Sequence, residues 1–188
     1  MTRIIRKVRD AGLFLALVFL GALIAARLED SAAVSISGPF VAVDGDTLAA
    51  GAERLRLEGL DAPEARQTCR DGGGRDWRCG EEARAMLERL TSAASVVCSG
   101  SERDRYERLL VRCRNGALDI NAELVRLGMA VASGGYSSEE AEARKGGDGL
   151  WAGEFDRPRD WRVRHGMMDD PSAAEGFVAW LKGWFGRN

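Results

Sequence analysis

The chain is organised around one stretch of nine residues, Arg56-Leu57-Glu58-Gly59-Leu60-Asp61-Ala62-Pro63-Glu64. At its start, apolar Leu55 and Leu57 alternate with charged neighbours, which is the period of a half-buried β-strand. Pro63 ends that strand, because its ring fixes its own backbone torsion and pushes the preceding residue towards an extended conformation. The stretch therefore predicts a strand and a rigid exit turn that restrain Asp61 relative to Glu64. On these residues alone, a solvated and charged strand end is an equal alternative.

The length and the charge of the chain limit the functions it can have. With 188 residues and a formal net charge of −2, the chain suits one globular domain with extensions, and it lacks the bulk positive charge of a protein that coats nucleic acid. Any recognition of phosphate must therefore be local, and one arginine cluster offers it: Arg103, Arg105, Arg108, Arg112 and Arg114. The single histidine, His165, lies in a polar tail, which argues against a histidine-based triad and a multi-histidine zinc site.

The first segments of the chain have the pattern of a targeting signal. Residues 1–10 form a basic flank and residues 11–26 carry no charge, so the flank is expected to stay in the cytoplasm while the rest is exported. The apolar run is long for a signal-peptide core and short for a membrane-spanning helix, so a cleaved signal peptide and a retained signal anchor both fit. Its end lacks a clean small-x-small cleavage site, which slightly favours the anchor. A buried N-terminal core helix is a third interpretation, and a linker is expected over 27–36.

Two aspartates are predicted to meet at the open end of a hairpin. The predicted elements are strands over residues 40–43, 47–50 and 54–60, with a turn at Asp44-Gly45-Asp46. If the last two strands pair antiparallel, Asp46 and Asp61 lie at the same end. Two such carboxylates either repel, which raises the pKa of one, or hold a hard divalent cation through oxygen ligands, for which Ca²⁺ is the natural candidate.

The four cysteines form two pairs. Cys69 and Cys79 flank a polar, glycine-rich loop, and Cys98 and Cys113 bracket two predicted strands whose turn lies midway between them. Cysteines placed symmetrically about a hairpin turn lie opposite one another in an antiparallel ladder, where a disulfide fits. In an exported domain this pattern predicts one disulfide between Cys69 and Cys79 and a second between Cys98 and Cys113. Zinc ligation by all four is the alternative, although none of them belongs to a CxxC pair.

The remaining segments predict helices around the strands. Apolar spacing indicates helices over residues 80–90 and 120–128, and a charged helix opens at Ser137. Short strands followed by helices suggest an α+β domain built on a small barrel. The tail at 164–188 contains an apolar helical face around Trp180 and Trp184, which suits either a helix docked on the domain or an interfacial membrane helix.

Three separated motifs carry a resemblance to a known family. They are Val43-Asp44-Gly45-Asp46-Thr47-Leu48, the stretch from Arg56 to Glu64, and Asp104-Arg105-Tyr106-Glu107-Arg108. In their order and spacing they resemble the thermonuclease, or staphylococcal-nuclease-like, family, from about Phe40 to about Trp161. The resemblance implies a five-stranded OB-fold barrel with about three helices, placed at residues 37–163. It also implies a Ca²⁺-dependent phosphodiesterase that cleaves DNA and RNA.

The resemblance assigns roles to the acidic residues. Asp46 and Asp61 match the family's calcium-ligating carboxylates, and Ala62 matches the position that lends a backbone carbonyl. Glu64 matches the catalytic glutamate, which would orient or deprotonate the attacking water. These roles suit the chemistry, because a phosphodiester is an anion that resists attack by water.

The resemblance also assigns roles to basic and aromatic residues. Arg56 and Arg108 match two arginines that grip the phosphate and donate planar hydrogen bonds as charge develops on its oxygens. Tyr106 matches a tyrosine beside the bound nucleotide, and Tyr136 matches another substrate-side tyrosine. Glu107 departs from the pattern, because the family usually has glycine there, and we expect it to alter the turn or to pair with Arg108.

These patterns together predict an exported, Ca²⁺-dependent nuclease with little sequence preference, whose partners are DNA or RNA and, through the N-terminal segment, the membrane. If the N-terminal segment is cleaved, the protein is periplasmic or secreted. The alternative is a non-catalytic OB-fold module that binds nucleic acid or a protein and is tethered to the membrane. An oligomer is not indicated. Degenerate members of this fold usually lose the arginines or carboxylates, and this chain keeps both, which favours the nuclease.

Overall fold

The computed structural model describes residues 12–23 and 33–167. Residues 12–23 form a helix. The strands that follow are β1 (Val34–Ser37), β2 (Val41–Ala42), β3 (Thr47–Ala50), β4 (Glu53–Leu57), β5 (Leu60–Asp61), β6 (Cys69–Arg70), β7 (Asp76–Trp77), β8 (Val96–Gly100), β9 (Leu109–Asn115), β10 (Leu118–Asp119) and β11 (Val131–Ala132). The helices among them are α2 (Cys79–Thr91), α3 (Ile120–Arg126), α4 (Ser137–Gly146), the short 3₁₀ helix η1 (Gly149–Ala152) and α5 (Pro158–Arg164).

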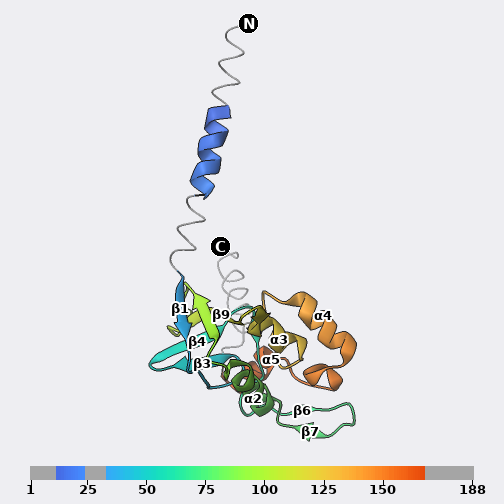
Figure 1. Ribbon diagram of the computed structural model, residues 1–188. Helices are drawn as coiled ribbons and strands as arrows, with labels where there is room; N and C mark the ends of the chain where they lie inside the picture. Colours follow the sequence, from blue (N-terminus) through green and yellow to red (C-terminus); the bar gives the residue numbers. More distant parts are fainter. Residues whose placement is uncertain (1–11, 24–32, 168–188) are drawn as a thin grey trace, which may run out of the picture.

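The main sheet has the strand order β1-β8-β9-β4-β3-β2, with β10 paired to β9. All of its pairs are antiparallel except β4 with β9, which run parallel. In Figure 1 this sheet lies on one side of the domain, α3 and α4 lie on the other, and α2 crosses below. The predicted α+β class with an OB-type barrel is confirmed. Among the described residues the domain has one more α-helix than the three expected, because α5 follows the predicted set.

The hairpin that carries the acidic motif forms as the sequence predicts. β3 and β4 pair antiparallel, so that Thr47 faces Arg56 and Ala50 faces Glu53. The predicted strand over 54–60 is interrupted, however, because Gly59 turns the chain between β4 and β5 with a φ of 82°. A side chain at Gly59 would lie 2.9 Å from the ring of Tyr136, so the turn needs glycine for both its torsion and its packing. Beyond this turn, β5 leaves the main sheet and pairs with β11.

The core lies between the sheet and α2 and α3. Inward-facing leucines and valines of β3, β4, β8 and β9 pack against the apolar faces of the two helices. The fully buried members of this core include Leu48, Leu55, Leu57, Leu87, Val96, Val111, Ile120 and Leu124. The strand residues of this core alternate along the sequence because successive side chains of a strand point to opposite faces. The carboxyl end of β4, and with it the acidic motif, is therefore held by a packed interior.

Both predicted disulfides are confirmed. Cys98 and Cys113 face one another in the register of β8 and β9, with their Cα atoms 4.0 Å apart. Cys69 and Cys79 join β6 to the first residue of α2, with their Cα atoms 5.7 Å apart. All four cysteines form disulfides, so the described domain has no free thiol for the alternative, a zinc site built from the four cysteines.

The ends of the chain are described only in part. Within the predicted signal segment, the helix at 12–23 exposes large apolar side chains such as Phe14 and Phe19. Neither this helix nor any other in the described ranges has the length and apolarity needed to cross a membrane. β1 lies mainly in the predicted linker, where it pairs with β8, so the sheet begins earlier than expected. The apolar face predicted around Trp180 lies outside the described residues.

Candidate active site

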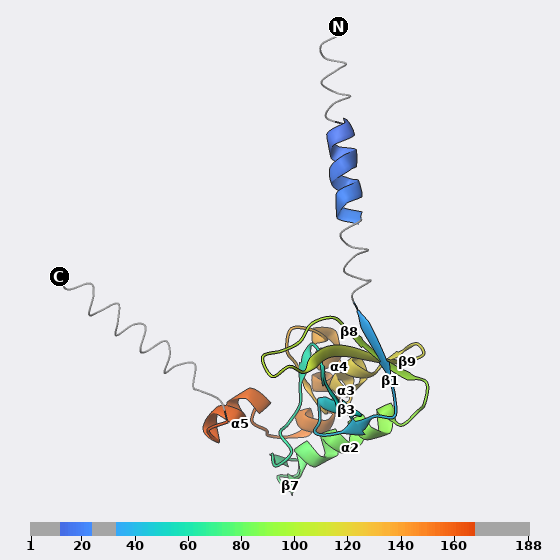
Figure 2. The ribbon, with the colours of Figure 1, turned by 90° about the vertical axis from the view of Figure 1, so that its left-hand side faces the viewer.

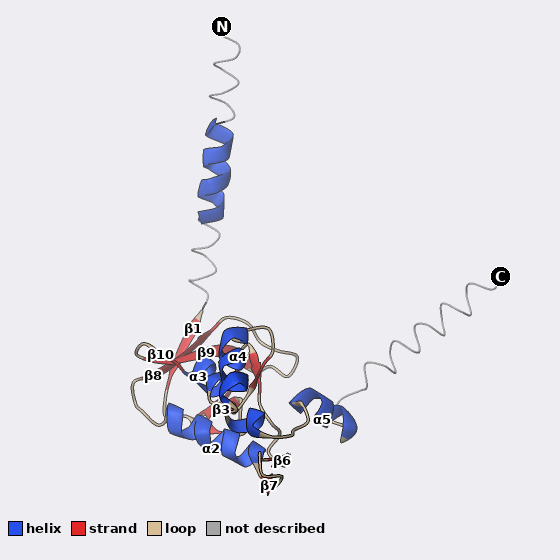
Figure 3. Cartoon of the chain, turned by 90° about the vertical axis from the view of Figure 1, so that its right-hand side faces the viewer, coloured by secondary structure: helices blue, strands red, loops and turns tan. Residues whose placement is uncertain are grey.

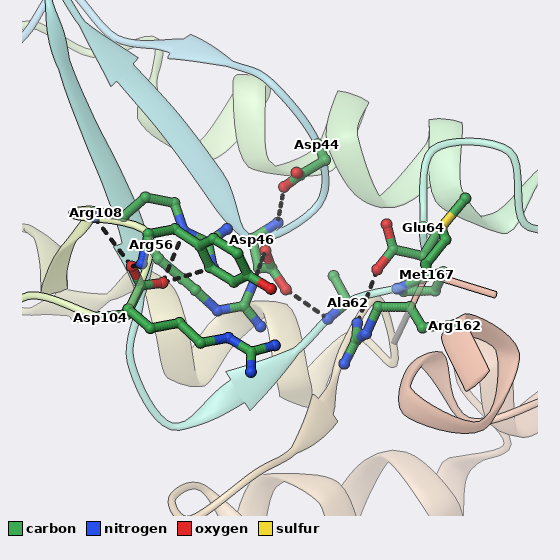
Figure 4. A pocket seen from close by; sticks show the side chains of 12 residues that line it. Asp44, Asp46, Arg56, Ala62, Glu64, Asp104, Arg108, Arg162 and Met167 are labelled. Atoms are coloured by element: carbon green, nitrogen blue, oxygen red, sulfur yellow. Dashed lines mark hydrogen bonds and ion pairs between the residues drawn. The ribbon is translucent and has the colours of Figure 1, made fainter. Parts of the chain in front are cut away.

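A polar cavity of about 500 Å³ gathers side chains from five parts of the fold. They come from the turn before β3, from β4, from the turn after β5, from the loop before β9, and from α5 with the residues that follow it (Figure 4). The lining includes six of the predicted site residues, namely Asp46, Arg56, Ala62, Glu64, Tyr106 and Arg108. Asp61 is absent from the lining but bonds to two of the arginines around it.

Asp46 is held between the hairpin turn and the start of the acidic exit turn. Its Oδ1 accepts from Arg56 Nη1 at 2.6 Å and from Thr47 Oγ1 at 3.2 Å, and its Oδ2 accepts from the backbone N–H of Ala62 at 3.0 Å. A side chain at the preceding Gly45 would come within 2.7 Å of the Ala62 Cβ, so only glycine lets the two turns touch. This close approach places Asp46 beside Asp61.

Burial sets the charge behaviour of Asp46, whose residue is 4% exposed. Loss of water around the carboxylate raises its pKa to about 7, against the opposing effect of the Arg56 guanidinium, and Asp44 adds to the rise. Repulsion between the two carboxylates, with a raised pKa, was one of the two behaviours expected from the sequence, and binding of a divalent cation was the other. Repulsion from Asp61 contributes, but burial is the larger cause. A buried carboxylate of this kind is charged at neutral pH only with help from nearby cations.

Arg56 supplies the first of these cations. The β3–β4 register sets it opposite Thr47, and from there its Nη1 reaches Asp46 while its Nη2 donates to Asp61 Oδ1 at 3.0 Å. Burial alone would lower the pKa of Arg56, but the two aspartates outweigh it and raise that pKa. One guanidinium therefore ties together the two carboxylates predicted to hold the metal.

The exit turn fixes the position of Glu64. Its backbone N–H donates to the side-chain oxygen of the buried Gln67 at 3.2 Å, and the amide of Gln67 in turn donates to the Asp156 carbonyl at 2.7 Å. The start of α2 also packs on this turn, because a side chain at Gly80 would overlap the Glu64 carbonyl at 1.8 Å. The turn predicted from Pro63 is thus held by Gln67 on one side and by the start of α2 on the other. The Glu64 side chain extends into the cavity (Figure 4).

Arg162 is a site residue that the sequence did not reveal. It comes from α5, and its Nη1 donates to Asp61 Oδ1 at 3.0 Å and to Glu64 Oε1 at 2.8 Å, while its Nη2 donates to Asp61 Oδ2 at 2.9 Å. Its side chain is 19% exposed, and although burial opposes its charge, these carboxylates raise its pKa. In the sequence Arg162 is one of several arginines near the end of the domain. Its position next to Trp161, which is buried, is the one signal that could have identified it as a site residue.

A second side of the cavity is the loop that precedes β9. Asp104 shapes this loop by accepting from the backbone N–H groups of Tyr106 at 2.9 Å and Arg108 at 3.0 Å. Its other oxygen holds the Arg108 guanidinium, with Nε at 2.8 Å and Nη2 at 2.6 Å. These bonds to Arg108 and to the backbone lower the pKa of Asp104 in spite of its partial burial. Asp104 was named in the motif without a role, and the structure shows that it positions the predicted phosphate-binding arginine.

Glu107 occupies the place where the resemblance implies glycine. Its φ is 62°, in the left-handed region that residues with side chains rarely adopt. The turn keeps its hydrogen bond from Glu107 N to the Asp104 carbonyl at 3.0 Å, and the Glu107 carbonyl accepts from Arg103 at 2.7 Å. Arg108 pairs with Asp104 rather than with Glu107. The expected pair between Glu107 and Arg108 is therefore not seen. The turn keeps its hydrogen bond, and Glu107 alters it only by placing a side chain in a strained backbone conformation.

The two predicted tyrosines lie in different environments. Tyr106 is 61% exposed at the cavity, and the guanidinium carbons of Arg105 and Arg108 lie 4.8 and 5.4 Å from its ring centre. Tyr136 does not line the cavity. It precedes α4, packs its ring against Gly59, and buries a hydroxyl group that has no hydrogen-bond partner among the described residues. Its predicted contact with substrate thus gains no support from the geometry.

The described part of the chain contains no cluster of three or more His, Cys, Asp or Glu side chains that could hold a metal ion by themselves. The predicted calcium ligands comprise the carboxylates of Asp46 and Asp61 and one backbone carbonyl. In the structure both carboxylates form ion pairs, Asp46 with Arg56 and Asp61 with Arg56 and Arg162. Any cation at Asp46 and Asp61 must therefore share these oxygens with guanidinium groups.

Comparisons with known proteins agree with this geometry. Residues 54–153 match the family described as staphylococcal nuclease homologue. The chain is 37% identical over 142 residues to the succinoglycan biosynthesis protein ExoI of Rhizobium meliloti, covering 70% of this chain and 74% of that protein. It is 30% identical over 131 residues to an uncharacterized endonuclease of Haemophilus influenzae, covering 63% and 68%.

A third relative is a probable staphylococcal-like nuclease, CAN2, of Oryza sativa subsp. japonica. The identity is 29% over 131 residues, which cover 65% of this chain and 32% of that longer protein. The family match spans more than half of the chain and includes the β4–β5 stretch from which the fold was inferred. By this match and by its fold, the chain belongs to the staphylococcal nuclease homologue family.

Proposed function

We propose that this protein is an exported nuclease that hydrolyses phosphodiester bonds of DNA or RNA with little sequence preference and depends on Ca²⁺. Membership of a nuclease family, with an endonuclease and a staphylococcal-like nuclease among its relatives, supports the nuclease activity. The finer statements on metal, substrate and export rest on the residues of this chain.

One observation carries the proposal. Glu64, Arg56 and Arg108 reach a single cavity beside two buried aspartates, although they come from separate elements of the fold. Hydrolysis of a phosphodiester needs a group that activates water and cations that neutralise charge on the phosphoryl oxygens. The cavity provides both within one enclosed space.

The residues at Asp46 and Asp61 suit a hard divalent cation. The donors are oxygen atoms only, from two carboxylates and the carbonyl of Ala62, which is the ligand chemistry that Ca²⁺ prefers. Both aspartates are buried, at 4% and 7% exposed, and buried carboxylates require cations to remain charged. When bound, Ca²⁺ would polarise a phosphoryl oxygen of the substrate.

The protein's own side chains divide the remaining work. Arg56 and Arg108 are each oriented by aspartate, and a guanidinium has five N–H donors, so both retain donors for a phosphate. Glu64, whose backbone is locked by Gln67, would orient and deprotonate the attacking water. Tyr106 presents an exposed ring on which a base can stack, and stacking tolerates any base, which supports weak sequence preference.

Export is supported by two independent features. The basic flank at 1–10 and the uncharged run at 11–26 have the order of a secretory or anchoring signal. The two disulfides of the domain are typical of proteins that fold outside the cytoplasm.

The decisive variant is Glu64→Gln, which removes the proposed base while keeping the size of the side chain. We expect its turnover on single-stranded DNA with Ca²⁺ to fall at least about a hundredfold, with the fold intact, because one group acting only in the transition state is commonly worth about 3 kcal/mol. The matched control is Glu58→Gln, since Glu58 lies outside the cavity lining and pairs with Arg112 at 3.2 Å. This control should keep its activity within about threefold.

Two outcomes would contradict the assignment. Equal turnover of Glu64→Gln and Glu58→Gln would show that Glu64 does not act in the hydrolysis step. A wild-type protein that binds DNA with Ca²⁺ present but does not cleave DNA or RNA would favour the non-catalytic binding module instead.

A further inference from the structure

The position of Arg162 has a consequence for metal binding. Its guanidinium donates to Asp61, a proposed metal ligand, and to Glu64, the proposed base. Figure 4 shows the contact with Glu64. The inference below rests on the proposed function, because it concerns the same carboxylates. It adds a regulatory contact that comes from α5, outside the motifs that define the site.

The acceptor capacity of Asp61 is nearly filled. A carboxylate offers about four lone-pair directions to donors or metals. Asp61 Oδ1 accepts from Arg56 Nη2 and Arg162 Nη1, each at 3.0 Å, and its Oδ2 accepts from Arg162 Nη2 at 2.9 Å. Two of these three bonds come from Arg162. Loss of Arg162 alone would therefore return most of the carboxylate to a metal ion.

The charge balance points the same way. Among the described residues, the carboxylates of Asp46, Asp61 and Glu64 are paired with two guanidinium groups, those of Arg56 and Arg162. Without Arg162, three carboxylates would share one guanidinium in a partly buried space, which strengthens their attraction for a divalent cation. With Arg162 in place, a cation that binds Asp61 must come close to the positive guanidinium that already contacts this carboxylate.

The helix that carries Arg162 is lightly attached. α5 has seven residues, of which only Pro158 and Trp161 are buried. Figures 2 and 3 show it at the edge of the domain, away from the main sheet. The ion pairs of Arg162 are therefore a substantial part of what holds α5 against the site, and such an element can move without disturbing the core.

We propose that Arg162 and a divalent cation compete for Asp61, so that cation binding releases Arg162 and loosens α5, while docked Arg162 restrains metal binding. The helix thus acts as an intramolecular inhibitor of metal loading. By thermodynamic linkage, the factor by which a bound cation weakens the docking of Arg162 equals the factor by which docked Arg162 weakens cation binding.

The test is a calorimetric titration of Ca²⁺ into the full chain and two variants. Arg162→Gln should bind Ca²⁺ at least about tenfold more tightly than wild type, a change on the order of 1.4 kcal/mol. The matched control is Arg159→Gln on the same helix, because Arg159 is exposed and does not line the cavity. Its affinity should stay within about twofold of wild type.

A second measurement needs no variant, so it holds even if Arg162→Gln fails to fold. Amide hydrogen exchange of residues 159–164 in the wild-type chain should become faster in saturating Ca²⁺ while exchange in β4 and β9 does not. Arg162→Lys, which keeps the charge but loses the planar two-pronged contact, should bind Ca²⁺ with an affinity between those of wild type and Arg162→Gln.

Unchanged or weaker Ca²⁺ binding by a folded Arg162→Gln variant, or unchanged exchange in α5, would overturn the competition. If wild type binds Ca²⁺ and cleaves DNA in those experiments, the proposed function survives and only the role of Arg162 is wrong. If neither wild type nor Arg162→Gln binds Ca²⁺ or cleaves, both the competition and the metal-dependent function are wrong.

Discussion

The two sides of the cavity are built in opposite ways. On the carboxylate side, Asp46 and Asp61 are buried and each oxygen accepts at least one hydrogen bond from a neighbouring arginine, hydroxyl or amide. On the loop side, Tyr106 is mostly exposed, and Arg108 is oriented by one aspartate of its own turn. The first side fixes charges at set positions, whereas the second presents a surface that different bases can contact. This division suits the proposed function, a nuclease with little sequence preference.

The cost of the two constructions also differs. The carboxylate side places charge in a buried site, which raises the pKa of Asp46 to about 7 and makes the site dependent on cations. The loop side stores backbone strain in the left-handed Glu107. The buried charge of Asp46 and the backbone strain of Glu107 lie on different sides of the cavity, so substitutions can change one without the other.

The largest effect that separates the two sides is expected at Arg108. Arg108→Lys keeps the positive charge but loses the planar donor pair, so kcat/KM should fall by about a hundredfold with little change in stability. Arg112→Lys is the matched control, because Arg112 is an exposed arginine in the following strand and pairs with Glu58 outside the cavity. Steady-state kinetics of both variants on one oligonucleotide checks the expectation. A similar small loss in both would mean that the loop side contributes charge in general and no specific contact.

A smaller effect is expected at Glu107. Glu107→Gly removes the side chain from a left-handed position, which should stabilise the domain by about 1 kcal/mol. Thermal unfolding measures the change. The reverse kind of substitution, Gly116→Ala, adds a side chain at a left-handed position with a φ of 59° and should lower the melting temperature. Activity should be kept, since Arg108 pairs with Asp104 and not with Glu107. A loss of stability on Glu107→Gly would show that the Glu107 side chain holds the loop.

Much of the carboxylate side was predictable because its determinants are local. Alternating leucines predicted β4, Asp-Gly predicted the turn before β3, and Pro63 predicted the rigid exit from β5. The cysteine spacing predicted both disulfides, since Cys98 and Cys113 lie symmetrically about one turn. In each case the physical cause acts between residues close in sequence or related by the geometry of a hairpin.

The features that escaped prediction depend on distant contacts. Gly59 turns the chain between β4 and β5, and the ring that packs on this turn belongs to Tyr136, far along the chain. The same packing directs Tyr136 inward, so its likeness to a substrate-side tyrosine did not place it at the cavity. Arg162 reaches Asp61 across 101 positions, and only its place beside the buried Trp161 sets it apart from Arg159 and Arg164. Periodicity cannot report on such contacts, because they are set by where α5 docks.

The proposed Ca²⁺ dependence is tested by cleavage of single-stranded DNA by the full chain, first with Ca²⁺, then after chelation, and again after Ca²⁺ is restored. We predict cleavage that stops with chelator and returns with Ca²⁺, because the proposed reaction requires a divalent cation at the buried aspartates of the cavity. Cleavage that continues undiminished in excess chelator, or no cleavage in any of the three conditions, would contradict it.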